Sequence, residues 1–484
     1  MGATNALRKK EKFKMYVNEK FEAFRTRMIG KKIAVIGMGI SNTPLIRYLI
    51  NLKSEITVFD KRDEEKLDPI VLEEFKNKGV KFSLGIDYLD ALQGFDFIFR
   101  SPSMRPDIEE VQREIQRGAI LTSEIEMVLK LCPGKIIGVT GSDGKTTTTT
   151  LIYKMLCEEG YNCYLGGNIG TPLFAAIDKM KPDDYVVLEL SSFQLMTAKV
   201  SPSIAVVTNI APNHLDIHKD YDEYINAKKN IFLYQKEDGL LVLNYDNEIT
   251  KSFEEEAKGK VRFFSTHSEL SNGVILGDDD STIFICENGD KREVIKANEV
   301  KLLGRHNLEN VCTAIAAVKE VVSINSIRNV LTTFTGVEHR NELVRVIDEV
   351  EWRNDSIGSS PSRTIAGLLS FKNKVILIAG GYDKQLNYTE LGTYIVSHVK
   401  SLILLGQTAQ KIKEATLKAM KEHEIDETDL KIFECTTLEE AVSVARELSV
   451  NGDVVLFSPA SASFDMFKNF EERGNKFKEL VNAL

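Results

Sequence analysis

Short apolar runs that alternate with amphipathic stretches recur along most of the 484-residue chain. Residues 33–37 predict a buried strand, residues 43–52 a helix, and residues 56–59 a second strand that ends at Asp60. Further strands are predicted at residues 96–99 and 119–122, with helical stretches between them. The residues to about 130 therefore predict one α/β domain.

The same alternation continues after the segment L131-C-P-G. Strands predicted at 135–140, 185–189 and 204–209 indicate a second, mainly parallel sheet. Between 240 and 300, short strands separated by polar turns favour an antiparallel appendage, and a helix over 307–322 returns to the block. After Gly336 a third block follows. Its strands are predicted near 375–379, 401–405 and 454–457.

These blocks predict an α/β protein of three domains. The expected organisation is a charged N-terminal extension (1–30), a Rossmann-like domain (31–130), a central P-loop ATPase-type domain with a parallel sheet (131–336) and a C-terminal Rossmann-like α/β domain (337–484). Within the extension, residues 5–28 have the pattern of a charged amphipathic helix. We expect that helix to be solvated, and we assign it no function.

Composition narrows the function classes. Hydrophobic residues make up 43% and charged residues 27%, as in soluble globular proteins, and the net charge of −9 argues against nucleic acid as a partner. Six scattered cysteines without a C-x-x-C pair indicate neither a zinc cage nor a disulfide framework, which favours a reducing cytoplasm. No run of about 18 apolar residues occurs, so we expect no membrane span and no export signal.

The strongest chemical signal is G138-V-T-G-S-D-G-K-T-T, where a predicted strand runs into a glycine-rich turn and then a helix. Such a turn presents backbone amides and a helix N-terminus to phosphates, with the lysine on the outer phosphates and a hydroxyl on Mg²⁺. The spacing departs from G-x-x-x-x-G-K-[ST], and the alternative is a chance glycine turn. The expected ATP-binding residues of this loop are Gly141, Ser142, Asp143, Gly144, Lys145, Thr146 and Thr147.

Three further segments follow in the order of a metal-assisted phosphoryl-transfer site. They are E189-L-S-S-F-Q-L, N209-I-A-P-N-H-L-D and A227-K-K-N-I-F. Because ligands bind beyond the carboxyl ends of parallel strands, Glu189 and His214 are expected near the phosphates as Mg²⁺ ligands. Taken alone, His214 would be an ordinary loop histidine and Lys228 a solvated helix residue. Their joint order favours the site.

Together these segments resemble the Mur ligase superfamily, the ATP-dependent amide-forming ligases of peptidoglycan precursor synthesis, over about residues 31–484. The motifs G304-R-H-N-L-E-N, H339-R-N-E and the stretch from S458-P-A-S to Gly474 are similar to those of its D-glutamate-adding members. The resemblance implies that ATP activates UDP-N-acetylmuramoyl-L-alanine as an acyl phosphate, to which D-glutamate is joined with release of ADP and phosphate. It also implies a cytoplasmic enzyme, and we expect a monomer.

The resemblance assigns roles to residues of the central site. It implies that Asn307, Asn310, Arg340 and Asp355 also bind ATP, and that two Mg²⁺ ions are held by Thr146, Glu189, His214 and Lys228. Lys145, His214 and Lys228 are then the catalytic residues. Lys228 matches a lysine that is carbamylated in the family, which turns a cation into an anion able to bind a metal. The sequence alone does not separate Lys228 from Lys229.

Two substrate sites are implied in the outer domains. The UDP-substrate is expected at Ser41, Asn42, Asp60, Lys61, Ser101 and Asn168, and D-glutamate at Ser359, Lys384, Ser463 and Phe470. One departure is D355-S-I-G-S, where relatives have D-S-K-A-T, so that Ile357 replaces a cation and Ser359 a threonine. Without the motif, Phe470 and Phe464 would be read equally well as core aromatics.

Three alternative functions remain open at this point. A folylpolyglutamate synthase would use the same ATP chemistry on folate. A nicotinamide-dependent dehydrogenase is suggested by G37-M-G-I-S-N with Asp60, although Asn42 stands where the third glycine belongs and the downstream loop stays unexplained. A nucleotide-regulated binding module would have no turnover.

Overall fold

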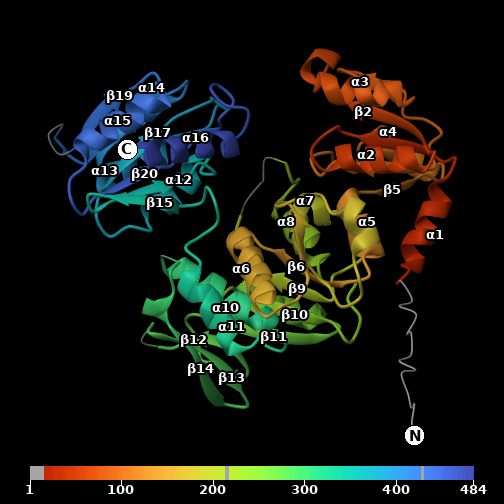
Figure 1. The fold of residues 1–484 in the computed structure, drawn as a ribbon, viewed down its shortest axis with the longest axis horizontal. Coiled ribbons are helices and arrows are strands. Elements are labelled where there is room, and N and C mark those ends of the chain that lie inside the picture. Colours follow the sequence, from red (N-terminus) through yellow and green to blue (C-terminus); the bar gives the residue numbers. More distant parts are fainter. Residues whose placement is uncertain (1–15, 213–216, 279, 303, 427–429) are drawn as a thin grey trace, which may run out of the picture. The chain divides into compact units, whose positions relative to one another are not determined.

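The computed structural model describes residues 16–212, 217–278, 280–302, 304–426 and 430–484. Three separate sheets organise these residues, each with helices in the connections between its strands (Figure 1). The α/β class with three Rossmann-like or P-loop sheets is therefore confirmed. Within the described residues, no helix is long and apolar enough to cross a membrane.

The first sheet is five-stranded and parallel, in the order β3-β2-β1-β4-β5. Its strands are β1 (Lys32–Ile36), β2 (Glu55–Asp60), β3 (Lys81–Leu84), β4 (Phe97–Arg100) and β5 (Ile120–Thr122). Its helices are α2 (Asn42–Asn51), η1 (Glu64–Lys66), α3 (Pro69–Asn77), α4 (Glu109–Gln116) and α5 (Glu124–Leu131). The strand order reverses at β1, so the loops after β1, β2 and β4 form the expected ligand crevice.

The described part of the N-terminal extension buries one face of its helix and exposes the other, which corrects our expectation of a solvated helix. Helix α1 (Glu19–Met28) buries Phe21, Phe24 and Met28. The ring of Phe21 lies 5.6 Å from that of Tyr48 and 5.9 Å from that of Phe174. These apolar positions follow i, i+3, i+7 spacing, and this stripe docks the helix despite its many charges. The predicted residues 5–15 of this helix lie outside the described residues.

The second sheet has nine strands in the order β14-β13-β12-β11-β10-β9-β6-β8-β7. They are β6 (Lys135–Thr140), β7 (Cys163–Gly167), β8 (Tyr185–Glu189), β9 (Ile204–Val207), β10 (Leu240–Asn244), β11 (Lys260–Ser265), β12 (Gly273–Leu276), β13 (Thr282–Glu287) and β14 (Asp290–Lys296). The associated helices are α6 (Lys145–Glu158), η2 (Phe174–Lys179), α7 (Ser192–Leu195), α8 (Tyr221–Lys229), α9 (Glu248–Ser252), η3 (Phe253–Glu256), η4 (Ala297–Glu299), α10 (Arg305–Val318) and α11 (Ile324–Thr333).

The predicted antiparallel appendage at 240–300 is wrong for its first half. Strand β10 pairs parallel with β9 and β11, and β11 pairs parallel with β12. Antiparallel pairing begins only between β12 and β13. Helices α9 and η3 form a crossover between β10 and β11, which allows the parallel sheet to continue where the short strands suggested hairpins.

The third sheet has the order β15-β16-β20-β17-β18-β19 and is parallel except for the β15–β16 hairpin. Its strands are β15 (Glu342–Ile347), β16 (Val350–Asn354), β17 (Val375–Ala379), β18 (Val399–Leu404), β19 (Lys431–Glu434) and β20 (Val454–Phe457). Its helices are α12 (Pro361–Leu368), α13 (Thr389–His398), α14 (Ala409–Glu422), α15 (Leu438–Leu448) and α16 (Phe470–Ala483). Two apolar clusters include side chains from alternate positions of its strands.

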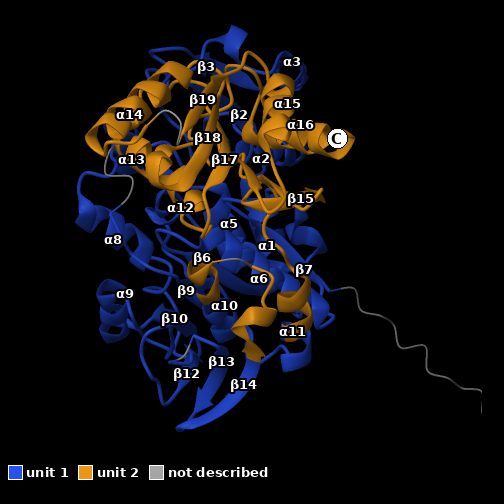
Figure 2. Cartoon of the chain, turned by 90° about the vertical axis from the view of Figure 1, so that its left-hand side faces the viewer, with its two compact units in different colours: residues 1–294, 309–327 blue, residues 295–308, 328–484 orange. Residues whose placement is uncertain are grey.

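The chain forms two compact units (Figure 2). Residues 1–294 and 309–327 make the first, which holds the first sheet and nearly all of the second. Residues 295–308 and 328–484 make the second, which holds the third sheet. The exact domain boundaries at 30, 130 and 336 stay predictions.

Candidate active site

The glycine-rich loop connects β6 to α6, as the sequence predicts. Gly144 caps the helix in the left-handed conformation (φ 76°), and Gly141 has φ 147°. A Cβ atom added at Gly141 would collide with Thr208 Oγ1, and one added at Gly144 would collide with Asn310 Oδ1. Both positions therefore require glycine for backbone conformation and for space.

Hydrogen bonds from the end of β9 hold this loop in place. Ser142 N donates to Asn209 O, and Asp143 N donates to Asn209 Oδ1. The donor–acceptor distance is 2.9 Å in both hydrogen bonds. Thr208 Oγ1 donates to Asp143 O (2.5 Å). Thr208 and Asn209 were not among the predicted site residues. Their position directly after a buried strand beside the loop is the signal that identifies them.

Lys145 opens α6 and folds back over the loop. Its Nζ donates to the carbonyl oxygens of Gly141 and Ser142, both at 2.9 Å. The next residue, Thr146, is partly exposed, whereas Thr147 is buried. The ammonium group thus lies at the mouth of the loop, beside the N-terminus of a 14-residue helix. This is a suitable position for a phosphate-binding cation.

The structure distinguishes the two adjacent lysines of α8. Lys228 is buried, and its Nζ donates to Gly141 O (2.7 Å) and Thr140 Oγ1 (3.3 Å). The Nζ of Lys229 instead pairs with Glu256 Oε1 at 2.5 Å. Burial, and next the charge of Lys145, hold the pKa of Lys228 well below its ordinary value. Burial therefore favours a neutral amine at Lys228, beside the glycine-rich loop.

Glu189 ends β8 next to the loop and is buried. Its Oε1 accepts a hydrogen bond from Asn168 Nδ2 (2.7 Å), while its Oε2 has no hydrogen-bond donor among the described residues. A buried carboxylate oxygen without a donor is costly unless a cation compensates it. Glu189 therefore fits a metal ligand. His214, the other predicted ligand, lies outside the described residues.

The other predicted ATP residues divide between the two units. In the first unit, Asn310 is buried and its Oδ1 accepts a hydrogen bond from Thr148 Oγ1 (3.4 Å). The Asn310 side chain therefore lies beside the start of α6, next to Gly144. Asn307, Arg340 and Asp355 belong to the second unit. There the buried Asp355 accepts a hydrogen bond from Ser458 Oγ (2.6 Å). Burial raises the pKa of Asp355 to about 6, although Ser458 and Arg340 act to lower it.

The first sheet carries the predicted UDP-substrate residues at its crevice. Asp60 and Asn42 are buried and hold the turn after β1: Asp60 Oδ2 accepts from Met38 N (2.8 Å), and Asn42 Nδ2 donates to Gly37 O (2.9 Å). Arg62, which sequence reasoning missed, forms an ion pair with Asp60: its NH2 lies 2.7 Å from Asp60 Oδ2. Burial acts to raise the pKa of Asp60, but the hydrogen bonds from Arg62 and Met38 outweigh it and lower that pKa.

The remaining residues of this set are more accessible. Ser41 and Ser101 are partly exposed, and Lys61 is exposed. Asn168 is exposed in the central sheet, where it contacts Glu189 as described above. The crevice thus combines a buried turn, fixed by Asp60 and Asn42, with accessible side chains around it.

The predicted D-glutamate residues lie in two places within the second unit. The Nζ of the exposed Lys384 lies 5.6 Å from the centre of the Phe464 ring. Ser463, which precedes Phe464 in the chain, is buried. Phe464 is 60% exposed, so the core-aromatic reading is wrong for this residue. Phe470 begins α16, is half-buried, and accepts a hydrogen bond at its carbonyl from Ser356 Oγ (2.8 Å).

Ser359 and Ile357 lie on the loop after β16. Both side chains are half-buried, and Ser359 N donates to Ile357 O (2.7 Å). The loop returns toward β15 through a hydrogen bond from Ile357 N to His339 O (3.1 Å). Ile357 therefore lies in a tightly turned segment.

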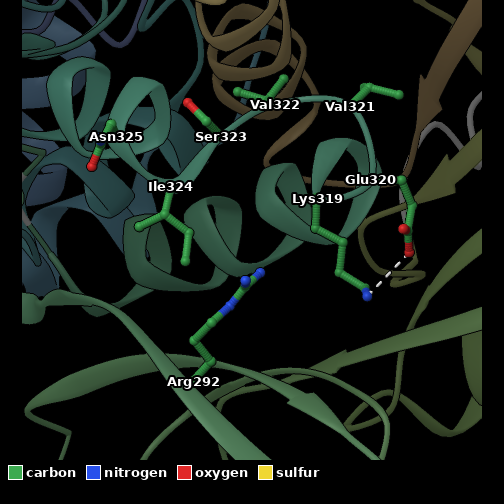
Figure 3. Close-up of a pocket in the computed structure, with 8 residues that line it drawn as sticks. All are labelled: Arg292, Lys319, Glu320, Val321, Val322, Ser323, Ile324 and Asn325. Atoms are coloured by element: carbon green, nitrogen blue, oxygen red, sulfur yellow. Dashed lines mark ion pairs between the residues drawn. The ribbon is translucent and has the colours of Figure 1, made fainter.

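A pocket of about 500 Å³ lies elsewhere in the first unit (Figure 3). Its lining comes from β14 and from the connection between α10 and α11: Arg292, Lys319, Glu320, Val321, Val322, Ser323, Ile324 and Asn325. Lys319 already pairs with Glu287 and Glu320. None of the predicted site residues lines this pocket, so it is not part of the candidate active site.

Comparisons with known proteins cover most of the chain. Three family models match it: the Mur ligase MurD-like N-terminal domain at residues 31–123, the Mur ligase middle domain at 139–318, and the Mur ligase glutamate ligase domain at 339–461. A UDP-N-acetylmuramoylalanine–D-glutamate ligase from Acetivibrio thermocellus is 56% identical over 469 residues, which is 97% of this chain and 100% of the relative. The corresponding ligase of Ruminiclostridium cellulolyticum is 52% identical, again over 97% of this chain and 100% of the relative.

Solved structures agree on the fold. The UDP-N-acetylmuramate-alanine ligase of Thermotoga maritima superposes with a TM-score of 0.58 at 18% identity, over 94% of this chain and 99% of that one. A pseudomurein peptide ligase from Methanothermus fervidus gives a TM-score of 0.53 at 21% identity, over the same shares. At such identities these two show the fold alone. With the three domain matches and the full-length relatives, the chain belongs to the Mur ligase family.

Proposed function

We propose that this chain joins D-glutamate to UDP-N-acetylmuramoyl-L-alanine in peptidoglycan precursor synthesis, with ATP converted to ADP and phosphate. The observation that carries the ligase chemistry is the convergence of Lys145, Glu189 and Lys228 on one glycine-rich loop. The choice of substrates rests on full-length relatives that are 50–56% identical to this chain and carry this activity in their names.

The reaction begins with the substrate carboxylate attacking the γ-phosphorus of ATP. An oxygen–phosphorus bond forms, the bond to ADP breaks, and the acyl phosphate carries a good leaving group. The amine of D-glutamate then attacks the acyl carbon, phosphate leaves, and the amine proton is lost. Lys145 offsets charge on the transferring phosphoryl group, because positioning and electrostatics dominate such transfers.

The residues present fit Mg²⁺. Thr146 offers a hydroxyl at the helix N-terminus, and Glu189 Oε2 is a buried oxygen with no donor among the described residues. Thr146, Glu189, His214 and Lys228 are the residues that we propose hold two ions. When bound, Mg²⁺ neutralises phosphate charge and polarises the phosphoryl oxygens.

The environment of Lys228 supports the proposal that this lysine is carbamylated. Carbamylation requires an uncharged amine, and burial favours that form here. The Nζ nitrogen would form a bond to the carbon of CO₂ and lose a proton, which gives an anion in place of a buried cation. We propose that this anion completes the metal site, a role that the exposed ion pair of Lys229 with Glu256 does not suit.

We propose that the two substrate sites are those expected from the family resemblance. The UDP-substrate binds at the crevice of the first sheet, through Ser41, Asn42, Asp60, Lys61, Ser101 and Asn168, and D-glutamate at Ser359, Lys384, Ser463 and Phe470. ATP also contacts Asn307, Asn310, Arg340 and Asp355. We further propose that the protein is cytoplasmic. We also propose that it is a monomer, because one chain carries all the proposed substrate-binding residues.

The proposal predicts a specific requirement for three substrates. Phosphate release should depend on ATP, UDP-N-acetylmuramoyl-L-alanine and D-glutamate together. A panel with L-glutamate, L-lysine, meso-diaminopimelate and D-alanine in place of D-glutamate should release phosphate at least about tenfold more slowly, since pockets that pair a charged group discriminate strongly. Preference for another amino acid would reject the substrate assignment, and folate as the best acceptor would favour the folate-ligase alternative.

A second prediction concerns Lys384. Replacing it by alanine should raise the KM for D-glutamate about tenfold or more, because a hydrogen bond to a charged group contributes about 1.5–3 kcal/mol. The KM for ATP should change less than about twofold, the signature of lost ground-state binding of one substrate. Steady-state phosphate release measures both constants.

The matched control for Lys384→Ala is Lys413→Ala. Lys413 lies on α14 of the same sheet and pairs with Glu434 at 2.6 Å, outside the proposed site. Its variant should keep both KM values. If Lys384→Ala changed only the KM for ATP, Lys384 would not bind D-glutamate.

A further inference from the structure

Two arginines connect the loop after β4 to helices α7 and α8 of the central domain and to the residues next to them. Arg100 ends β4, and Arg105 lies within the loop that runs from Ser101 to the start of α4 at Glu109. Ser101 is a proposed contact of the UDP-substrate. Neither arginine has a role in the function proposed above, and both reach segments that belong to the metal side of the site.

Arg100 is a buried cation whose hydrogen bonds within the described residues all go to carbonyl and hydroxyl oxygens. Its NH1 donates to the carbonyls of Pro102 (3.3 Å) and Met104 (2.9 Å), within the loop. Its Nε donates to Thr197 Oγ1 (3.2 Å), and its NH2 donates to the carbonyl of Phe193. Burial lowers its pKa to about 10. A buried guanidinium needs these acceptors, so they specify one conformation of the loop against the segment that follows Glu189.

Arg105 makes the second attachment, to α8. Its NH2 and NH1 donate to Glu223 Oε1 (2.7 Å) and Oε2 (3.0 Å), a bidentate pair, and NH1 also donates to Ile217 O (2.7 Å). Glu223 lies in the first turn of α8, the helix that carries Lys228. Both side chains of the pair are 25% exposed, so the interaction is partly shielded from water.

The two attachments meet in one cluster. His218 Nδ1 lies 3.3 Å from Glu223 Oε2, and its Nε2 lies 2.9 Å from Ser192 Oγ. The His218 ring stacks on Phe193 at 4.9 Å between ring centres, and Phe193 is the residue whose carbonyl accepts from Arg100. The loop of the first sheet is therefore bound to α7 and to α8 through a continuous set of contacts.

We propose that Arg105, together with Arg100, is a positioning residue that sets the distance between the UDP end and the reacting carboxylate of the substrate. The inference rests on the proposed function, because Ser101 contacts one end of an extended molecule and Lys228 lies at the other. A positioning residue of this kind affects where the bound UDP-substrate lies relative to Lys228. It leaves the ATP loop, whose anchors are Thr208 and Asn209, in place.

The test is a double-mutant cycle of Arg105→Ala and Glu223→Ala, with Arg105→Lys as the conservative variant. Each alanine variant should lower kcat/KM for UDP-N-acetylmuramoyl-L-alanine about tenfold, and the double variant should fall no further than about twentyfold, because the two side chains act as one pair. The KM for ATP should stay within about twofold. Arg105→Lys should recover part of the loss, since it keeps the charge but not the bidentate geometry.

The matched control is Arg47→Ala. Arg47 also makes a bidentate pair, with Glu74: its Nε donates to Oε1 (3.1 Å) and its NH2 to Oε2 (2.8 Å). This pair is in the first sheet's domain, between α2 and α3. Its loss should leave all kinetic constants within about twofold. The melting temperature of each variant shows whether it is folded. If Arg105→Ala is unstable, Arg105→Lys is compared with Arg47→Ala in its place.

Two kinds of failure are distinguishable. A parent chain that releases no phosphate with the three substrates would overturn the proposed function, and this inference with it. An active parent whose Arg105→Ala variant matches Arg47→Ala, or raises the KM for ATP as much as that for the UDP-substrate, would overturn this inference alone. Losses that multiply in the double variant, to about a hundredfold, would also overturn it.

Discussion

Replacing Lys145 by alanine is expected to lower phosphate release at saturating substrates by at least about 100-fold, as removal of one preorganised charge-stabilising donor does. The ammonium group lies 2.9 Å from two carbonyl oxygens of the loop that we propose binds the phosphates. Those contacts hold it in the folded chain, so it needs little reorganisation to meet the transferring phosphoryl group. The fold should survive, because the side chain is only partly buried.

The control for Lys145→Ala lies on the same helix. Lys154 is an exposed residue of α6, and Lys154→Ala should retain parental turnover. Circular dichroism and melting temperature should match the parent in both variants. Turnover of Lys145→Ala within a few-fold of the parent would reject the assignment of this loop to ATP.

Replacing Lys228 by alanine should be comparably severe, with a loss of at least about 100-fold in phosphate release. In this variant the proposed carbamate cannot form, and the proposed metal site would lack one anionic ligand. A short carboxylic acid such as acetate or formate should restore part of the activity, because it can occupy the vacated space and supply the missing negative charge. Titration of the variant with acetate, read as phosphate release, measures this rescue.

Lys229→Ala is the control for that result. It removes an adjacent lysine of the same helix whose Nζ pairs with Glu256, away from the loop. Its activity should stay close to the parental value, and acetate should have no effect on it. An inactive Lys229→Ala beside an active Lys228→Ala would show that the carbamylated residue is Lys229.

The glycine-rich loop could be predicted from sequence because all of its determinants are local. A strand, two glycines, a lysine and a helix follow one another within ten residues, and Gly144 adopts the left-handed cap that such a turn requires. The choice between Lys228 and Lys229 is not local. Adjacent helix residues point about 100° apart, and only the packing of α8 against β6 determines which amine reaches Gly141.

Other features depended on partners that are distant in sequence. The docking of α1 requires Phe174, about 150 residues after Phe21, and the charges of the helix masked its apolar stripe. Asp60 was expected to face a ligand, but much of its capacity to accept hydrogen bonds is used by Arg62 and Met38. The parallel pairing of β10 with β11 follows from a crossover whose helices are too short to give a clear periodic pattern.

The crowding at Gly144 has a genetic consequence. An alanine there would meet two separate obstacles: a left-handed backbone, which costs about 1–2 kcal/mol for a residue with a Cβ atom, and the side-chain oxygen of Asn310. Shortening Asn310 would remove the collision, but it would leave the backbone strain and delete a proposed ATP contact. A second-site suppressor at Asn310 therefore cannot fully compensate the change, and revertants of Gly144→Ala should be dominated by restored glycine codons.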